Sequence, residues 1–526
     1  MLIKWISKSS EKYEGDVKDY ISKVRNINDM DEYLNPSSKN VLSPFKIRNI
    51  QIAVERIIKA VSNKEKIVVV PDIDPDGCMA TVIMVQCLQK LDADVSYIYH
   101  QRSEGHGIEH DDVPDDTELL IILDSSSSSV ERCRELSETM DIIIIDHHNI
   151  EKENDAAILV NINHPECPYE NKNLSATGVV WKVVEVLDYH YKKFNINHFL
   201  DLVSVTLLSD SMRVDNLENR WILKEGMKNI HNVGLLALIK ASKINRVNSQ
   251  ELNYSVIPVL NTATRNDEIQ KVFSLLFEKD YFKAKAKADW MIKENKARKE
   301  RIKVLFEEYK ELASVDKFIL VATPTATKNY NGLVAQKLSS EYMRPALVLK
   351  DMGNTYEGSG RSYNGFDLQG FLKECPYVKY AAGHTEALGV GIDKKDWKKF
   401  KQYVNENIDE SLFEPVIEYD IELNEDELDW DLVNNILEID EVWGQGSPPI
   451  TVRLNDVFVE DKELFPPTRQ EHVRIKADMF DALKFNDKDY AEEIQAWDQI
   501  SMIGSIGINE FNKNKRIQLF IEDYKK

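Results

Sequence analysis

The stretch KIVVVPDIDPDG, residues 66–77, decides the fold class of this chain. A short β-branched run ends in three alternating acids, Asp72, Asp74 and Asp76, and then in Gly77. β-branched residues favour strands, and a glycine permits a tight turn into the helical pattern that follows. The stretch therefore predicts a buried strand whose carboxyl end carries carboxylates and leads directly into a helix.

Two further apolar runs repeat this design downstream. LLIILD spans residues 119–124 and DIIIIDHH spans 141–148, and helical patterns separate the runs. Strand-length apolar runs that alternate with helices indicate an α/β domain with a parallel sheet. Each run ends in acidic or histidine residues, and ligands of open α/β sheets bind at the carboxyl ends of the strands. We therefore expect the three strand ends to converge in one crevice.

The residues at these ends form a candidate metal centre. Three neighbouring carboxylates repel one another unless cations lie between them. Capped turns, a calcium loop and packing histidines are the alternative interpretations of the single motifs. Carboxylates with one or two imidazoles suit Mn²⁺ or Mg²⁺, and two such ions can catalyse an in-line phosphoryl displacement. The candidates are Asp72, Asp74, Asp76, Asp124, His147, His148 and Asp210, the last of which follows the apolar stretch LVSVTLL.

Length and composition set the broad class. The 526 residues predict roughly three to four domains, and 43% hydrophobic residues exclude global disorder. No apolar run is long enough for a membrane span, and the N-terminus lacks the pattern of a secretory signal. Five scattered cysteines argue against a disulfide framework or a thiolate zinc site, and for the reducing cytoplasm.

The charge is acidic and uneven. The net charge is −22, which taken alone argues against a nucleic-acid partner. Residues 415–526, however, hold 26 acids and 12 bases, so most of the excess lies in the last fifth of the chain. The remainder is balanced enough to carry a basic groove. Residues 283–303 hold nine bases and three acids; they predict either a solvated helical strut or a face that follows a phosphate backbone.

The rest of the chain divides into three regions. Residues 183–310 are mostly helical in pattern, and a second α/β pattern runs from 318 to about 410. Residues 415–431, with eight acids and no base, are interpreted as a linker or as an entry segment, and the last hundred residues form short β-like runs typical of a small barrel. Four aromatic residues of this region could stack against nucleic-acid bases, but we expect them to be buried in a core: Trp430, Trp443, Phe458 and Trp497.

The order of these motifs resembles the DHH phosphoesterase superfamily, and within it the RecJ single-stranded-DNA exonucleases. PDIDPDG, LLIILD, IDHH and VSVTLLSD resemble the four superfamily motifs. The strings more specific to RecJ are YLNPSSKNVLSPF, QRSEGHG, LENRWIL, VLNTATR, GSGRS, AAGHTEALG, VWGQGSPPI and SIGINEFNKNKRIQLFIED.

The resemblance implies an α/β architecture of five parts. They are an N-terminal segment (1–50), a parallel-sheet DHH catalytic domain (51–240), a helical connector (241–312), an α/β DHH-associated domain (313–412) and a C-terminal β-barrel of the OB type (413–526). We expect single-stranded DNA to run through a cleft between the DHH and associated domains.

The resemblance also implies residue roles. Asp74 and Asp76 would each ligate one ion, Asp124 would bridge them, and His147 and Asp210 would complete the second site. Asp72 is a supporting or additional ligand, because Val70 stands where the family often carries histidine, and His148 would contact phosphate. Five residues would bind the substrate. Its 5′-phosphate end would be bound by Arg102, Ser359 and Arg361, and its backbone would be contacted by Arg265 and His384.

The implied function is a 5′→3′ single-stranded DNA exonuclease that acts as a monomer with two divalent ions, preferably Mn²⁺, otherwise Mg²⁺, and releases 5′-mononucleotides. The substrate would carry a 5′-phosphate, candidate protein partners are a single-strand-binding protein or a helicase, and DNA repair and recombination are the implied settings. Two alternatives remain: a short-oligonucleotide or cyclic-dinucleotide phosphodiesterase of the same superfamily, and a catalytically inactive replication or repair scaffold. The region 415–526 disfavours the first, and the retained acids and His147 disfavour the second.

Overall fold

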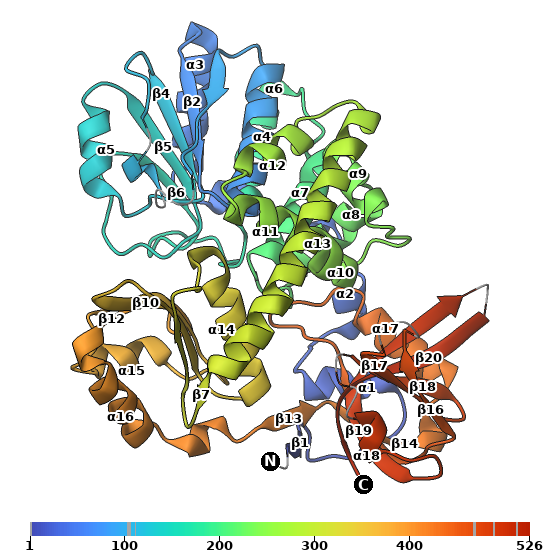
Figure 1. Cartoon of the computed structure of the whole chain (residues 1–526). Helices are drawn as coiled ribbons and strands as arrows, with labels where there is room; N and C mark the ends of the chain where they lie inside the picture. Colours follow the sequence, from blue (N-terminus) through green and yellow to red (C-terminus); the bar gives the residue numbers. More distant parts are fainter. Residues whose placement is uncertain are drawn as a thin grey trace. The chain divides into compact units, whose positions relative to one another are not determined.

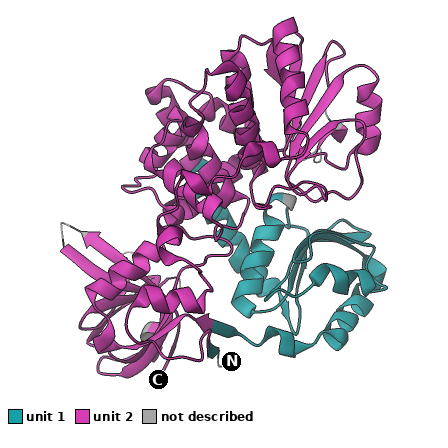
Figure 2. Cartoon of the chain, turned by 180° about the vertical axis from the view of Figure 1, so that it is seen from behind, with its two compact units in different colours: residues 1–6, 293–417 teal, residues 7–292, 418–526 magenta. Residues whose placement is uncertain are grey.

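The computed structural model describes residues 3–101, 107–110, 112–466, 470–485, 487, 490–511 and 514–526. The chain forms two compact units, which Figure 2 colours separately. Unit 1 comprises residues 1–6 and 293–417, and unit 2 comprises residues 7–292 and 418–526. The boundary at 292–293 falls inside the long helix α13, Tyr281–Leu312, so this helix contributes to both units.

Unit 2 contains the predicted parallel sheet, with strand order β3-β2-β4-β5-β6 and every adjacent pair parallel. This confirms the α/β class that the apolar runs predicted. The strands and helices of this part are α1 (Val17–Val24), α2 (Met30–Leu34), α3 (Ile50–Asn63), β2 (Ile67–Pro71), α4 (Pro75–Lys90), β3 (Val95–Tyr97), β4 (Leu119–Leu123), α5 (Val130–Ser137), β5 (Asp141–Asp146), β6 (Ile158–Asn161) and α6 (Ala176–Tyr191).

Helices cover both faces of this sheet (Figure 1). Ile67 and Val69 belong to a core that includes apolar residues of α3, α4 and α6, whereas Val68 and Val70 pack into a second core with residues of α5. Successive side chains of a strand point to opposite faces, so a strand that is covered on both faces must be apolar throughout. This explains the uninterrupted run in the sequence. The register aligns Pro71 with Leu123, so the strand ends lie at one edge.

A helical region follows, as predicted. It consists of α7 (Leu200–Ser209), α8 (Leu217–Lys228), α9 (Val233–Ala241), α10 (Ser249–Glu251), a π-helical turn at Leu252–Val256, α11 (Ile257–Arg265), α12 (Ile269–Leu276) and α13. Among the described residues, no helix has both the length and the apolar character that a membrane span requires. All five cysteines are free and buried, in agreement with the expectation that they form no disulfide framework.

Unit 1 contains the second predicted α/β region, a mixed sheet in the order β11-β12-β10-β9-β8-β7. Its β8–β9 pair is parallel and the other pairs are antiparallel. The elements are β7 (Ser314–Val315), β8 (Ile319–Thr323), α14 (Lys328–Tyr342), β9 (Ala346–Asp351), β10 (Thr355–Arg361), α15 (Leu368–Glu374), β11 (Tyr380–Gly383), β12 (Ala387–Asp393) and α16 (Trp397–Asn407).

The C-terminal part of unit 2 is the predicted small β domain, a seven-stranded sheet in the order β14-β15-β19-β20-β18-β17-β16. β19 and β20 pair in antiparallel fashion up to Phe511 and Asn514, and residues 512–513 lie outside the described residues. The elements are β14 (Ile421–Asn424), α17 (Trp430–Ile439), β15 (Thr451–Phe458), β16 (Asp461–Phe465), β17 (His472–Lys476), β18 (Phe480–Lys484), α18 (Tyr490–Glu493), β19 (Gln499–Phe511) and β20 (Asn514–Lys525).

Two expectations from the sequence were wrong. Residues 415–431 are not a linker, because β14 pairs with β15 inside the sheet and β13 (Val416–Tyr419) pairs with β1 (Lys4–Ser7). Core burial fails for Trp497, which is 76% exposed, for Phe458 (43%) and for Trp430 (37%). Most bases of 283–303 are exposed, as both interpretations of this helix require, but Arg298 is buried and its Nη2 donates to the Asn329 carbonyl.

A buried carboxylate links the N-terminal segment to the helices of unit 2. Glu218 on α8 is 3% exposed and accepts hydrogen bonds from the Leu42 N–H, the Tyr169 hydroxyl and the Asn171 amide. It also pairs with the fully buried Lys182 ammonium of α6 at 3.0 Å. Removing one partner of such a pair leaves a buried charge uncompensated.

We expect Glu218→Ala to destabilise the protein by about 3–5 kcal/mol. Glu225→Ala on the same helix removes only a surface ion pair with Lys228 and should cost less than about 1 kcal/mol. Chemical denaturation followed by circular dichroism measures both. Equal losses in the two variants would show that the Glu218 network has no special structural role.

Candidate functional site

The first acidic motif lies where β2 turns into α4. Asp74 is the N-cap of α4, and its side chain accepts from the N–H groups of Asp76 and Gly77. Gly77 is required because a Cβ there would lie 2.4 Å from the Asp72 carbonyl oxygen. The tight turn therefore holds Asp72, Asp74 and Asp76 together at the carboxyl end of the strand, as the sequence predicted.

Asp76 is held by the start of a second helix. The N–H of Ala176 donates to its Oδ2 at 2.7 Å, and the N–H of Thr177 donates to its Oδ1 at 3.0 Å. These are the first two residues of α6, whose terminal N–H groups lack partners within the helix and favour a negative charge. Asp76 thereby keeps a fixed orientation although it is 1% exposed.

Asp124 directly follows β4 and occupies the centre of the site. Its backbone is in the left-handed region, with a φ of 65°, and only 1% of the residue is exposed to solvent. Neither carboxylate oxygen receives a hydrogen bond from a donor in the described part of the chain. A buried carboxylate without donors is costly, so it points to a positively charged ligand.

His147 points one bare nitrogen at the carboxylates. Its Nδ1 lies 3.0 Å from the Leu174 carbonyl oxygen, so Nδ1 carries the proton, and burial lowers the pKa of this imidazole. Nε2 is therefore the unprotonated nitrogen, and it lies 3.2 Å from Asp210 Oδ2, 3.4 Å from Asp124 Oδ1 and 3.9 Å from Asp76 Oδ2. A carbonyl behind Nδ1 is the usual arrangement for a histidine that ligates a metal through Nε2.

Asp210 reaches the site from outside the sheet. It is the C-cap of α7, and its side chain is 28% exposed. Together the residues form three overlapping groups, and within each group one ligand atom per residue lies within 4.8 Å of the others. The groups are Asp72–Asp74–Asp124, Asp76–His147–Asp210 and Asp124–His147–His148.

The electrostatics of the site favour cations. Burial, followed by the neighbouring carboxylates, raises the pKa of Asp74 to about 6 and that of Asp210 to about 8. The same causes raise the pKa of Asp124 well above its ordinary value. Divalent cations would compensate this accumulated charge, and carboxylates with one imidazole match the donor chemistry of Mn²⁺ and Mg²⁺. The residues thus fit the metals that the sequence suggested.

Sequence reasoning gave Asp146 no role. Its buried carboxylate accepts from the Ser127 hydroxyl at 2.6 Å, from the N–H of His147 and from the ring of His148 at 2.8 Å. It therefore orients both histidines. The hydrogen bond that its ring donates to Asp146 raises the pKa of His148 to about 9, which favours the cationic imidazole at neutral pH. The available signal was Asp146 itself, the first letter of the Asp-His-His motif.

The predicted substrate residues are not all in this unit. Arg102 lies outside the described residues, and Arg265 is the exposed last residue of α11 in unit 2. Ser359 and Arg361 lie two residues apart on β10 of unit 1. Arg361 pairs with Ala387 of β12, whose carbonyl accepts the N–H of His384, so these two residues lie at the same end of the sheet.

Comparisons with known proteins agree with this geometry. The sequence profile of the DHH family, N-terminal domain, matches residues 66–206, and that of the RecJ OB domain matches residues 419–523. The single-stranded-DNA-specific exonuclease RecJ of Bacillus subtilis is 28% identical over 93% of this chain, which spans 65% of that protein's length. RecJ of Haemophilus influenzae is 24% identical, over 96% of this chain and 95% of that protein.

A solved structure shows the same fold. The crystal structure of RecJ from Thermus thermophilus in complex with Mn²⁺ matches all of this chain and 80% of its own, with a TM-score of 0.81 and 20% identity.

We expect Mn²⁺ to raise the thermal midpoint of the protein, because an ion that binds only the folded state stabilises it by about 2.7 kcal/mol at a hundredfold excess over its Kd. Asp124→Asn should lose most of this shift. The shift should also shrink as the pH falls from 8 to 6, because protons then compete for Asp210 and Asp74.

The matched control is Asp141→Asn, at the opposite end of β5 from Asp146, where the side chain pairs with Arg56. This variant should respond to Mn²⁺ as the wild type does. Differential scanning calorimetry with Mn²⁺ or EDTA measures the shift, and an unchanged shift in Asp124→Asn would refute its role as a ligand.

Proposed function

We propose that this chain, a RecJ-like member of the DHH superfamily, is a metal-dependent exonuclease that hydrolyses single-stranded DNA from its 5′ end and releases 5′-mononucleotides. The observation that carries the proposal is the pair formed by Asp124 and His147. Both oxygens of Asp124 and the Nε2 of His147 are buried and have no hydrogen-bond partner among the described residues, and Nε2 lies 3.4 Å from Asp124 Oδ1.

Two groups of residues would hold the ions. Asp72, Asp74 and Asp124 would hold one, and Asp76, His147 and Asp210 the other, with Asp124 near both. Two divalent ions, preferably Mn²⁺, would lower the pKa of a bound water and stabilise charge on the phosphoryl group. The group Asp72–Asp74–Asp124 contains no imidazole. This supports a role for Asp72 as the ligand that replaces the histidine found in the family.

The chain's own residues prepare the reaction in three ways. Leu174 fixes the His147 tautomer, and Asp146 keeps His148 protonated. The His148 side chain is 56% exposed and its Nδ1 is bonded to Asp146, so its Nε2–H can donate to a phosphate oxygen of the substrate. The helix start at Ala176 and Thr177 holds Asp76 in place before any ion binds.

We infer that Arg102, Ser359 and Arg361 bind the 5′-phosphate end, and that Arg265 and His384 contact the backbone of the strand. Arg361 and His384 lie at the same end of the sheet, which supports binding of the phosphate end and the adjoining backbone at one place. Gly332 supports it too, because a Cβ there would lie 2.6 Å from Arg361 Nη2, so the residue leaves room for the guanidinium. A planar guanidinium suits a terminal phosphate.

We also propose the domain limits given by the motifs: 1–50, 51–240, 241–312, 313–412 and 413–526. The profile matches at 66–206 and 419–523 support the second and fifth. We also propose that the protein is cytoplasmic, which its five free buried cysteines support. We propose further that it is a monomer and that it binds a single-strand-binding protein or a helicase. The intact carboxylate groups favour an enzyme over an inactive scaffold.

We expect end-labelled single strands to be degraded from the 5′ end in Mn²⁺ and to remain intact in EDTA. Asp124→Asn and Asp210→Asn should each slow hydrolysis by about 10³-fold or more, since loss of one preorganised stabilising group already costs about 10²–10³. Asp141→Asn is the control and should keep full activity. Near-normal turnover in Asp124→Asn would rule out the two-ion assignment, and 3′-terminal release would rule out the polarity.

We expect Arg361→Ala to weaken binding of 5′-phosphorylated strands by about 10- to 100-fold, because a charge-assisted pair with phosphate contributes about 1.5–3 kcal/mol. Hydrolysis at saturating substrate should change much less. Arg344→Ala, which removes an arginine that pairs with Glu410 in the same unit, is the control. The role is wrong if Arg361→Ala weakens 5′-hydroxyl and 5′-phosphate strands equally.

A further inference from the structure

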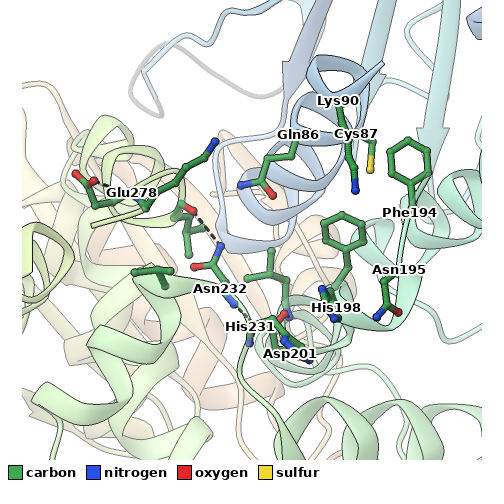
Figure 3. Close-up of a pocket in the computed structure, with 15 residues that line it drawn as sticks. Gln86, Cys87, Lys90, Phe194, Asn195, His198, Asp201, His231, Asn232 and Glu278 are labelled. Carbon is green, nitrogen blue, oxygen red and sulfur yellow. Dashed lines mark hydrogen bonds between the residues drawn. The ribbon is translucent and has the colours of Figure 1, made fainter. Parts of the chain in front are cut away.

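A cavity of about 300 Å³ lies in unit 2, apart from the metal-ligand groups (Figure 3). It is located at the far ends of two helices, α4 and α7, whose other ends carry Asp76 and Asp210. Gln86 and Lys90 of the last turns of α4 line one side. His198, from the segment before α7, and His231, from the segment before α9, line another. The volume is at the lower end of the range for small-molecule sites, about 300–1,000 Å³.

The acids of this cavity are already occupied. Asp201 is 1% exposed, and its carboxylate accepts the N–H groups of Leu202, His231 and Asn232, each at 2.7 Å. Glu278 accepts from the Lys287 ammonium at 2.7 Å and from two backbone N–H groups. Neither carboxylate is left to pair with another cation of the cavity.

The basic groups, in contrast, keep their hydrogen-bonding capacity. Within the described residues, Lys90, Lys279, His198 and His231 form no ion pair with a carboxylate, although the chain carries a net charge of −22. The two imidazoles stack with centroids 4.0 Å apart and planes 21° apart, and the Lys90 ammonium lies 5.7 Å from the centroid of the Phe194 ring. Two lysines and two carboxylates line the cavity, but both carboxylates already accept hydrogen bonds from other groups, so the lysines are the charges left to bind a ligand and the cavity favours an anion.

The cavity also offers apolar surface beside these donors. Phe194, Phe199 and Leu276 line it together with the amides of Gln86 and Asn195. A phosphate group could be bound by the lysines and imidazoles, and a planar base could lie against the phenyl rings. Inorganic phosphate and a nucleoside monophosphate both carry the phosphate dianion that these groups would bind.

The two helices connect this cavity to the catalytic residues. α4 carries Asp76 in its first turn and Lys90 at its end, and its 16 residues span about 24 Å. α7 runs between the same two places, with Asp201 in its first turn and Asp210 as its C-cap, and it contacts α4. A ligand that contacts both helix ends can therefore bias the positions of Asp76 and Asp210.

We propose that this cavity binds a phosphate-bearing anion of mononucleotide size, separate from the catalytic centre, and that occupancy changes the affinity of the catalytic centre for its ions. The coupling rests on the proposed function, because a 5′-mononucleotide would be the product of that reaction. Binding itself does not, because Lys90, Lys279 and the histidine pair are present whatever the catalytic centre hydrolyses.

Calorimetric titration of the full chain in EDTA tests the binding, since chelation removes any metal-bound phosphate. The probes are deoxyadenosine 5′-monophosphate, inorganic phosphate and deoxyadenosine. We expect the monophosphate to bind, and Lys90→Ala combined with His231→Ala to weaken it at least tenfold. Binding of inorganic phosphate as well would identify the phosphate as the ligand, and binding of the monophosphate alone would identify the nucleotide.

The matched control combines Lys193→Ala with His190→Ala, an exposed lysine and histidine of the same region that do not line the cavity. It should bind as the wild type does. Lys90→Glu, a single surface change, provides a second test if the double variant unfolds at a lower temperature. The site is refuted if no phosphate compound binds, if deoxyadenosine binds equally well, or if the cavity variants bind like the control.

Coupling is tested by titrating Mn²⁺ into the metal-free protein with and without the monophosphate. Linkage requires each ligand to change the other's affinity by the same factor. We expect the monophosphate to change the Kd for Mn²⁺ at least twofold more in the wild type than in the cavity double variant. The double variant serves as the reference because Mn²⁺ also pairs with the monophosphate in solution. Equal changes in both proteins would overturn the coupling. Absence of nuclease activity, by contrast, would overturn the proposed function and leave the binding result intact.

Discussion

Mutual repulsion among buried carboxylates is the constraint around which this molecule is organised. Asp74, Asp76, Asp124 and Asp210 come from three elements and meet at a site where Asp76 and Asp124 are almost completely shielded from water. Folding brings them together only because rigid parts hold each one in place: the β2–α4 turn for Asp74, the α6 N-terminus for Asp76 and the α7 C-cap for Asp210. The apolar sheet supplies the free energy for this arrangement, and divalent ions would relieve it.

The sequence predicts most of this design, because the information is local. A β-branched run that ends in acids and glycine defines a strand, its end and a turn within twelve residues. The α/β class, the helical region, the second α/β region and the small β domain follow from such patterns. The carboxylates and His147 could be named because each one ends an apolar run.

What the sequence could not supply are contacts made over long separations. Nothing near Asp76 indicates that Ala176 and Thr177, about a hundred positions away, donate to it. Ser127 stands in a run of five serines, residues 125–129, that does not indicate which of them donates to Asp146. Arg298 looked like one of many helix cations, but its burial against the Asn329 carbonyl depends on the fold of unit 1. The acids of 415–431 obscured a strand because β14 alternates buried Ile421 and Leu423 with exposed residues.

The left-handed backbone at Asp124 restricts how this protein can change over evolutionary time. With φ of 65°, the position readily accommodates glycine, asparagine or aspartate, and is strained for most other residues. Genetic drift at this codon therefore has few structurally neutral outcomes, and asparagine, one base change from aspartate in the genetic code, keeps the shape while removing the charge. Asparagine at this position would therefore preserve the backbone conformation while removing the central charge of the site, so the fold could outlast the metal centre after a single substitution.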